Sequence, residues 1–234
     1  MRRAGQVAKA TLQSVRGQIA GMRTTAEIAD LVASDTAARG GRPSQLGYHG
    51  FPAVCCTSKN EIVCHGIPSP HEKLLPGDIV NVDVTTEFGG FHGDTSATFF
   101  IGDPSPEARH VVRVAEEARN VGIRALVVGR RLGEVGAAIE DYVTREGCSV
   151  VRDLGGHGIG RQMHLPPHVH HHRSPGGPRL RAGMALTIEP MVNLGSAEVV
   201  FSSDGWTVVT KDGALSAQFE HTILITDQGP EILT

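Results

Sequence analysis

One glycine-rich stretch, residues 155–164, constrains the fold of this chain more than any other part of the sequence; it reads GGHGIGRQMH. Glycines at this density favour neither a stable helix nor a core strand, but they let the backbone approach another segment closely. The spacing is G-x-G-x-G, and Pro166-Pro167 follow where a phosphate-binding loop needs the first turn of a helix. We therefore reject phosphate binding, and the question becomes what His157 and His164 of this stretch bind.

The size, charge and cysteine content of the chain exclude several classes of protein. Its 234 residues are long for one domain and short for two, and 40% of them are hydrophobic, which suffices for a substantial core. The net charge of -3, the absence of a long apolar segment and the polar N-terminus give no case for nucleic-acid binding, membrane insertion or secretion. The four cysteines show neither C-x-x-C zinc spacing nor a disulfide framework. We expect a soluble cytoplasmic protein without specific nucleic-acid or membrane partners.

The spacing of hydrophobic residues predicts helices, strands, helices and strands, in that order. The helices are predicted at residues 7–19, from the capping box Thr24/Glu27 to Gly40, from Ser105-Pro106 to about Val128, and from Leu132 to Gly147. The strands are predicted at residues 79–84, 94–99, 149–154, 185–190, 206–210 and 220–226. Residues 55–58 and 61–64, which flank Lys59-Asn60, are predicted to form a β-hairpin.

A weak internal repeat links two of the predicted strands. In both, an acid (Asp83 or Glu189) stands six residues after a glycine (Gly77 or Gly183), at the end of a mostly apolar strand. Alternate residues of both strands include a small polar one, as expected where one face of a strand lines a site. The repeat indicates two related halves.

Four acidic residues, Asp83, Asp94, Glu189 and Glu220, lie in or beside these predicted strands. A buried carboxylate is costly unless a cation or a metal ion neutralises it, and arginine partners are not evident in the sequence. Two divalent ions a few Å apart would neutralise the acids together, and four carboxylates with the imidazole of His157 suit Mn, Fe, Co or Zn. Such ions would acidify a bridging water and hold it as hydroxide against a carbonyl group.

The alternative is that these acids are ordinary ion-pair partners on exposed edge strands. For any one of the acids, the two interpretations are equally tenable. For all four acids and His157 in one chain, the metal site is the simpler explanation.

Taken together, six stretches of the chain resemble the type I methionine aminopeptidases. In the order of that family they are CHGIP (64–68), GDIVNVDV (77–84), GDTS (93–96), GHGIG (156–160), TIEPM (187–191) and SAQFEHT (216–222). The resemblance implies the pita-bread fold, an α+β architecture whose curved antiparallel sheet carries helices on its outer face. It also implies one catalytic domain over residues 1–234, with pseudo-symmetric halves at about 1–103 and 104–234.

The resemblance assigns a role to each metal-binding position. Asp83 binds the first of two divalent ions (Co, Mn, Fe or Zn), and His157 and Glu189 bind the second. Asp94 and Glu220 bridge the two ions.

The resemblance also implies a monovalent cation near Asn60 and Ser216. The nearby run His168, His170, His171 and His172 is interpreted instead as a polar loop after the site, where any metal binding would be adventitious.

Substrate-binding and catalytic roles follow from the same resemblance. His65 contacts the substrate near the scissile amide, and His164 hydrogen-bonds the scissile carbonyl and its developing oxyanion. Glu189 shuttles a proton from the attacking water to the leaving amine. The methionine side chain is expected to lie against Tyr48, Phe51, Cys56, Met163 and Trp206, whose sulfur and aromatic groups suit a thioether. A nucleophilic Cys56 is the alternative, but no base stands beside it in the sequence.

The implied enzyme is a metal-dependent aminopeptidase that removes methionine from nascent polypeptide N-termini when the second residue is small. A monomer is expected, and transient ribosome association is left open. The first alternative is an Xaa-Pro aminopeptidase or prolidase-like hydrolase; such proteins generally carry an N-terminal domain, whereas this chain opens inside the first predicted helix. The second alternative, a non-catalytic binding protein of the same fold, is disfavoured because all five ligand positions are filled.

Overall fold

The computed structural model describes residues 1–234. Its helices are α1 (Arg2–Gln18), α2 (Thr25–Ala38), α3 (Pro106–Ala125) and α4 (Leu132–Arg145), with short 3₁₀ helices η1 (Ile19–Gly21) and η2 (Tyr48–Gly50). Its strands are β1 (Arg42–Pro43), β2 (Cys56–Lys59), β3 (Ile62–Cys64), β4 (Ile79–Phe88), β5 (Phe91–Phe100), β6 (Ser149–Val150), β7 (Gly156–Gly158), β8 (Leu165–Val169), β9 (Ala185–Ile188), β10 (Met191–Asn193), β11 (Val199–Phe201), β12 (Val208–Thr210), β13 (Ser216–Gln218), β14 (Glu220–Thr226) and β15 (Gly229–Ile232). The predicted order of helices, strands, helices and strands is confirmed.

Side-chain caps define where two of the helices begin. The N–H of Glu27 donates to Thr24 Oγ1 at the start of α2, and the N–H of Ala108 donates to Ser105 Oγ at the start of α3. Each cap satisfies a donor that the first helical turn leaves free. Helix α3 ends at Ala125 rather than near Val128, so its predicted length was slightly too great.

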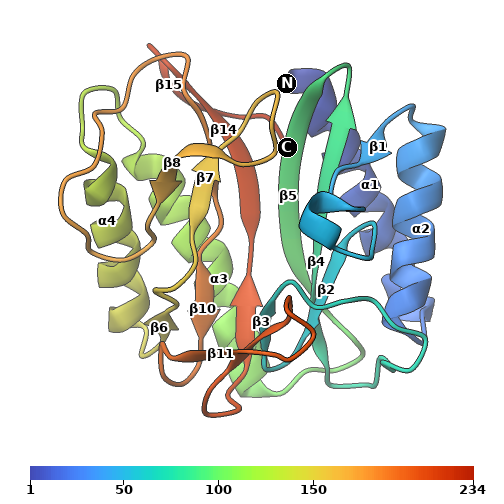
Figure 1. The fold of residues 1–234 in the computed structure, drawn as a ribbon. Coiled ribbons are helices and arrows are strands. Elements are labelled where there is room, and N and C mark those ends of the chain that lie inside the picture. The colour runs from blue at the N-terminus through green and yellow to red at the C-terminus, as the bar shows by residue number, and fades with distance from the viewer.

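The main sheet is antiparallel and curved, with the strand order β1-β4-β5-β14-β9-β7-β8; β2 pairs with β4, and β15 with β14. Figure 1 shows α1 and α2 on one side of the molecule and α3 and α4 on the other. Helix α1 contacts β4 and β5, whereas α3 contacts β9 and β14. The helices therefore cover the outer face of the sheet, and the predicted α+β class with a curved antiparallel sheet is confirmed.

The hydrophobic core lies between these helices and the outer face of the sheet. One cluster joins buried residues of all four helices to buried residues of the strands, including Val15, Ile28, Ile139, Ile188 and Ile223. Successive strand residues point to opposite faces, so apolar side chains toward the helices leave the alternate, mostly polar ones for the concave face. That alternation leaves the concave face free to carry a site.

The predicted hairpin over residues 55–64 is wrong. Strand β2 pairs with β4, whereas β3 pairs with β12 in a separate three-stranded sheet. Strand β1 pairs with β4 only at residues 86–87, so residues 80–83 of the same strand are free to pair with β2. The sequence pattern located both strands, but it could not show that a distant partner would compete with the nearby one.

The glycine-rich stretch also departs from expectation, because residues 156–158 form β7 between β8 and β9. A Cβ on Gly156 would meet the carbonyl oxygen of Thr187, and one on Gly158 would meet that of Pro166. The expected close approach of backbone to backbone is therefore present, but it occurs inside the sheet. Glycine is needed here because the neighbouring strands leave no room for a side chain.

The two glycines of the internal repeat lie in matching surroundings. Gly77 and Gly183 have φ angles of 102° and 90°, and β4 and β9 each begin two residues later. The N–H of Gly77 donates to the carbonyl of Ile101 over 2.7 Å, and that of Gly183 donates to the carbonyl of Ile225 over 2.8 Å. The matching bonds support two related halves within residues 1–234, a division that stays a prediction.

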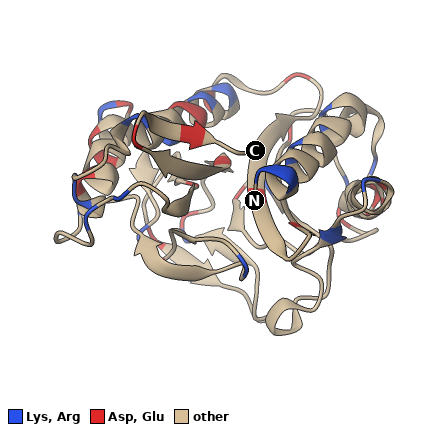
Figure 2. Cartoon of the chain, turned by 90° about the horizontal axis from the view of Figure 1, so that it is seen from above, with Lys and Arg blue, Asp and Glu red and all other residues tan.

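The charged residues lie largely at the periphery. In Figure 2 the lysines and arginines are found mainly on the outer helices and loops, and the two termini lie close together. A two-pronged ion pair between Arg2 and Glu231, with both N···O distances at 2.7 Å, links the beginning and end of the chain. None of the helices combines the length and apolar character needed to cross a membrane.

Two glycines inside helices provide a matched test of this packing. A Cβ on Gly136 of α4 would fall on the carbonyl oxygens of His170 and His172, whereas one on Gly17 of α1 would meet nothing within 4 Å. We expect Gly136→Ala to lower the free energy of unfolding by about 1–3 kcal/mol because the backbone contact must open. Urea unfolding followed by circular dichroism measures the change.

The control, Gly17→Ala, should instead leave stability equal or raise it by up to about 1 kcal/mol, because alanine favours helix more than glycine does. Equal behaviour of the two variants would contradict the close packing of residues 170–172 against α4.

Candidate active site

The register of the sheet brings the predicted acids to one face. Asp83 of β4 is directly opposite Ser96 of β5, and Ser96 is directly opposite Glu220 of β14. Asp94 lies two residues before Ser96, so its side chain points to the same face. Glu189 directly follows β9, whose last residue pairs with the neighbour of Glu220. The adjacent strands β4 and β5, the end of β9 and the start of β14 thus supply four carboxyl groups to neighbouring places on the concave face.

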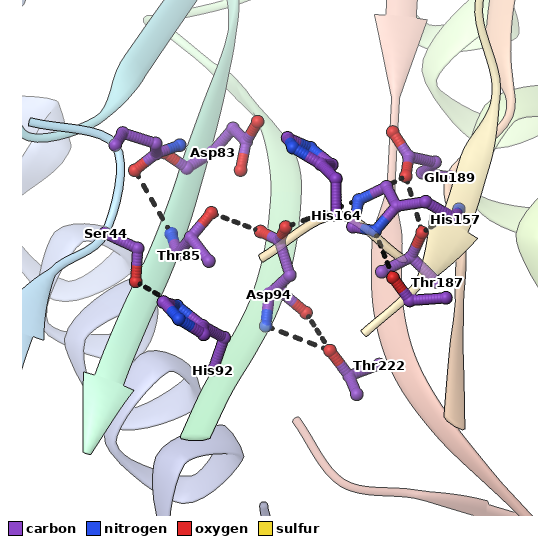
Figure 3. A network of polar contacts seen from close by, with 12 residues as sticks. Ser44, Asp83, Thr85, His92, Asp94, His157, His164, Thr187, Glu189 and Thr222 are labelled. Atoms are coloured by element: carbon purple, nitrogen blue, oxygen red, sulfur yellow. Dashed lines mark hydrogen bonds and ion pairs between the residues drawn. The ribbon is translucent and has the colours of Figure 1, made fainter. Parts of the chain in front are cut away.

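A cavity of about 420 Å³ opens over this face. Every predicted metal, catalytic and substrate residue lines it: Tyr48, Phe51, Cys56, His65, Asp83, Asp94, His157, Met163, His164, Glu189, Trp206 and Glu220. Figure 3 shows the carboxylates of Asp83 and Asp94 on one side, with His157 and Glu189 facing them from the other. The structure therefore brings the whole predicted set together.

Three of the predicted ligands converge most closely. One ligand atom each from Asp94, His157 and Glu220 lies within 4.8 Å of the other two. His157 Nε2 is 3.8 Å from Asp94 Oδ2 and 3.5 Å from Glu189 Oε1. Ligands bound about 2.0–2.2 Å from one ion are separated by up to about 4.4 Å, so the 3.5 and 3.8 Å separations around His157 suit a divalent ion.

The hydrogen bonds of His157 determine which ring nitrogen faces the carboxylates. Its Nδ1 is 3.0 Å from the carbonyl oxygen of Gly158, and a carbonyl can only accept, so Nδ1 carries the proton. The lone pair is then on Nε2, which faces Asp94 and Glu189. One buried oxygen of Asp83 and one of Glu220 have no hydrogen-bond partner. Several carboxylate oxygens and an imidazole lone pair that face one another are what a bound cation requires, so these residues fit a metal centre.

Burial shifts the pKa values of all four acids upward. Desolvation, reinforced by the neighbouring carboxylates, raises the pKa of Asp83 and Glu220 well above the ordinary range. Desolvation also raises the pKa of Asp94, although the hydrogen bond from Thr85 opposes the shift. The same desolvation raises the pKa of Glu189 to about 8. No lysine or arginine lines the cavity. The protein itself supplies no positive charge here, so divalent ions are the fitting counter-charge.

Two further histidines lie at the cavity. Tyr48 Oη is 2.7 Å from Nδ1 of His164, and the His164 ring lies edge-on to that of His157 with 4.2 Å between centroids. Desolvation and the charge of His157 lower the pKa of His164 to about 4, and burial lowers the pKa of His65. His65 has a φ of 56°, which is uncommon for a non-glycine residue. Both imidazoles are neutral near pH 7.

The predicted side-chain pocket has an aromatic wall. Phe51 and Trp206 meet edge to face with 5.1 Å between ring centroids, and His65 lies edge-on to Trp206 at 6.5 Å. Cys56 is buried, and burial beside Asp83 raises the pKa of its thiol well above the ordinary value. A protonated thiol is a poor nucleophile, so the geometry favours Cys56 as a pocket-lining residue.

Sequence reasoning missed several residues that support this site. Thr85 Oγ1 donates to Asp94 over 2.7 Å, Thr187 Oγ1 donates to Glu189 over 2.6 Å, and Gln218 Nε2 donates to Glu189 over 3.3 Å. The sequence already placed Thr187 on the site-facing side of its strand. Thr85 and Gln218 were missed, although each stands two residues from a predicted ligand and the two-residue period of strands was the available signal. Gln45, which donates to the carbonyl of Asp83, lies in a loop and carried no such signal.

The histidine run is not a uniform loop. His168 belongs to β8 and lines the cavity, and its ring lies 4.4 Å from that of His170. His171 is 1% exposed, and its Nε2 accepts from the N–H of Glu189 over 3.2 Å. His172 is half-buried. The expectation of a single polar loop was therefore wrong for the first part of the run.

The residues expected near a monovalent cation are also adjacent. The N–H of Ser216 donates to the carbonyl of Asn60 over 2.9 Å, and Asn60 turns the chain with a φ of 53°. The cation itself stays a prediction.

Comparisons with known proteins agree with this arrangement. The sequence profile of Metallopeptidase family M24 matches residues 1–227. Methionine aminopeptidase A of Synechocystis is 50% identical over 100% of this chain and 93% of its own length. The crystal structure of the methionine aminopeptidase from Thermotoga maritima superposes with a TM-score of 0.97 at 40% identity, covering 100% of this chain and 94% of that one. The corresponding structure from Rickettsia prowazekii gives 0.96 at 42% identity, with the same coverage. These neighbours confirm the expected pita-bread fold.

The raised carboxyl pKa values predict how metal binding depends on pH. An ion must displace the proton that Glu189 holds below about pH 8, and the protons on the other acids whose pKa values burial raises. Each displaced proton lowers the affinity about tenfold for each pH unit below the pKa. We therefore expect the rise in melting temperature caused by Mn to be larger at pH 8 than at pH 6, and calorimetry in buffers of different ionisation enthalpy should detect released protons.

The same carboxyls affect the metal-free protein in the opposite direction. Their pKa values are higher in the folded than in the unfolded chain, so their stabilising contribution is full at low pH and is lost as the pH rises toward about 8. A metal-induced stabilisation that does not change between pH 6 and pH 8 would contradict the proposed carboxyl cluster.

Proposed function

The chain belongs to metallopeptidase family M24, as its resemblance to the methionine aminopeptidases indicated, and we propose that it removes N-terminal methionine from nascent polypeptides whose second residue is small. The observation that carries the proposal is the cavity in which a cluster of metal-binding acids adjoins an apolar pocket. Identity of 50% to a named methionine aminopeptidase over the whole chain supports the same activity.

The metal-binding roles implied by the resemblance would fall to five residues of the cavity. Asp83 would hold one divalent ion, His157 and Glu189 a second, and Asp94 and Glu220 both. When bound, the two ions would supply Lewis-acid chemistry, lowering the pKa of water and polarising the scissile carbonyl. Co, Mn, Fe and Zn remain the ions that this donor set suits.

Glu189 would transfer the proton. Thr187 donates to one oxygen of its carboxylate and Gln218 to the other, so the group is held in one orientation while lone pairs remain free. A carboxylate held in this way can take a proton from the attacking water and give it to the leaving amine.

His164 would stabilise the oxyanion through its outer nitrogen. If Tyr48 donates its hydroxyl proton to Nδ1, the ring proton resides on Nε2, which is then free to donate to the scissile carbonyl. Tyr48 would therefore select the tautomer, and the neutral state of the ring near pH 7 is compatible with this role. His65 would contact the substrate near the same bond.

The methionine side chain would occupy the apolar part of the cavity. Phe51, Trp206 and Met163 offer aromatic and thioether contacts, which suit the polarisable sulfur of methionine. Cys56 would lie at the inner end, and Gln45 Nε2 stands 3.8 Å from its sulfur.

The two alternatives are weaker. The relatives that are 46–50% identical over the whole chain are methionine aminopeptidases, whereas Xaa-Pro hydrolases of the same fold are only 19–21% identical, which disfavours an Xaa-Pro hydrolase. A non-catalytic protein has no need for four acids grouped in one cavity, because each carboxylate removed from water is costly without an ion. We further propose that the enzyme acts in the cytoplasm, where nascent N-termini occur; the monomeric state and ribosome association stay predictions.

A peptide-release assay tests the proposed activity. Protein loaded with Mn or Co should free methionine from Met-Ala-Ser, should act far more slowly on Met-Lys-Ser, and should leave Ala-Pro-Ser intact, because the pocket selects a thioether and the neighbouring space a small residue. Chromatography of the released amino acids measures all three. Release from Ala-Pro-Ser would favour the Xaa-Pro alternative.

Glu189→Gln provides the inactive control for the same assay. Loss of the proton-transfer group should lower turnover by at least about 100-fold while the circular dichroism spectrum is unchanged. No release from any peptide by the metal-loaded wild type would leave only the non-catalytic alternative.

The Tyr48–His164 bond predicts a graded effect on turnover. His164→Ala should lower kcat by about 100-fold with little change in KM, because an oxyanion donor acts in the transition state. Tyr48→Phe should lower kcat by about 10-fold, since the ring remains but its tautomer is no longer selected. Tyr142→Phe removes the other tyrosine hydroxyl of the chain, which does not line the cavity; this variant is the control and should keep the wild-type kcat. A rise in KM alone would make His164 a binding residue.

A further inference from the structure

The histidine run contains one imidazole that no proposed step uses. His171 is among the largest fully buried side chains, with 1% of its surface exposed. It does not line the cavity, so it contacts neither the substrate nor the proposed ions. Its Nε2 instead accepts from the backbone N–H of Glu189 over 3.2 Å.

The N–H of Glu189 needs this acceptor because the strand ladder does not provide one. Strand β9 ends at Ile188, which pairs with His221 of β14, and Pro190 follows Glu189. The N–H therefore lies just beyond the last paired residue, in a half-buried position. A buried donor without a partner is unfavourable, and an imidazole lone pair satisfies it.

The bond also defines the state of His171. A backbone N–H can only donate, so the lone pair of the ring is on Nε2 and its proton is on Nδ1. A protonated imidazolium would present a second N–H to the same donor and break the contact.

The segment that carries His171 is held by the backbone on its other side. Gly136 of α4 lies so close that a Cβ there would fall on the carbonyl oxygens of His170 and His172, and a Cβ on Gly133 would fall 2.7 Å from the carbonyl oxygen of Ser174. Two glycines on one helical face thus allow residues 170–174 to lie against α4. His171 projects from this anchored segment toward the metal centre, so its position is defined independently of the cavity.

Glu189 is then supported at three points. Its N–H donates to His171, one carboxylate oxygen accepts from Thr187, and the other accepts from Gln218. Thr187 also accepts from the N–H of His157, so one hydroxyl connects two of the proposed ligands. The side-chain bonds limit rotation of the carboxylate, whereas His171 limits rotation of the main chain from which the carboxylate projects.

We propose that His171 is a positioning residue: by accepting the Glu189 N–H, it holds the main chain so that the carboxylate faces the metal centre and the leaving amine. This inference rests on the proposed function and adds to it a residue outside the cavity. His171 therefore links the segment that packs against α4 to Glu189, the acid that would transfer the proton.

The test compares His171→Gln with His171→Asn and His171→Leu. The Oε1 of glutamine reaches about as far as Nε2 and can accept the N–H, whereas asparagine is too short and leucine cannot accept. With Mn or Co bound, we expect His171→Leu and His171→Asn to lower kcat by about 10- to 100-fold with KM nearly unchanged, and to weaken metal binding in chelator competition by a similar factor. His171→Gln should recover most of both quantities.

A second measurement does not depend on turnover. The visible absorption bands of the Co-loaded protein report ligand geometry, so they should shift in the Leu and Asn variants and return toward wild type with glutamine. His170→Leu, in the same segment but outside the cavity, is the matched control and should leave kcat, metal affinity and spectrum unchanged.

The outcomes separate this inference from the proposed function. If the wild type releases methionine but folded His171→Leu and His171→Asn have wild-type kcat and metal affinity, the positioning role is overturned. It is also overturned if glutamine behaves like asparagine, because the loss then reflects packing and not the acceptor. If His171→Leu fails to fold, the comparison of glutamine with asparagine decides. A wild type that releases no methionine would overturn the proposed function itself.

Discussion

Four carboxyl groups buried around one cavity without a lysine or arginine among its lining residues are the constraint on which this structure depends. Such a cluster is unstable as a set of anions, and the upward shifts of all four pKa values express that cost. Divalent cations remove the cost, because they replace the protons and use the free lone pairs. The cavity, the tautomers of its histidines and the hydrogen bonds that orient its side chains are all consistent with this need for divalent cations.

The register of the sheet brings these carboxyl groups to one face, where they can share divalent cations. Asp83, Ser96 and Glu220 stand opposite one another on three adjacent strands, and the two-residue period places Asp94 on the same face. The helices cover the other face with apolar contacts, so the polar face is available for chemistry. A shift of one residue in any of these ladders would send a ligand into the core, which makes strand pairing part of the active site.

Around the proposed ligands lies a layer of groups that orient them. The carbonyl of Gly158 selects the tautomer of His157, Tyr48 is placed to select that of His164, and Thr187 connects His157 to Glu189. His171 extends this layer to helix α4. Metal-binding groups commonly depend on such partners for their geometry, and here most of the partners are neutral side chains or backbone atoms.

Much of the fold was predictable where local physics decides. Thr24 and Ser105 begin their helices as their side-chain chemistry predicts, and β4 and β5 follow the alternation of residues 79–99. The prediction failed where distant partners decide: β2 left its sequence neighbour for the open edge of β4, and the glycine stretch became a strand because two other strands press against it. The alternation of apolar and polar residues predicts a strand, but it does not identify the strand with which it pairs.

For the site, the sequence alone determined which residue types carry the chemistry. The sequence alone showed the acids within apolar strands, His157 among its glycines and the motifs shared with the methionine aminopeptidases. These features could be recognised because the charge of a residue, its apolar neighbours and glycine density are local properties. Only the tertiary structure decided the pairing of Tyr48 with His164 and of His171 with Glu189, residues 116 and 18 positions apart. A hydrogen bond across such separations depends on how strands and helices are placed in space, and no local pattern encodes that placement.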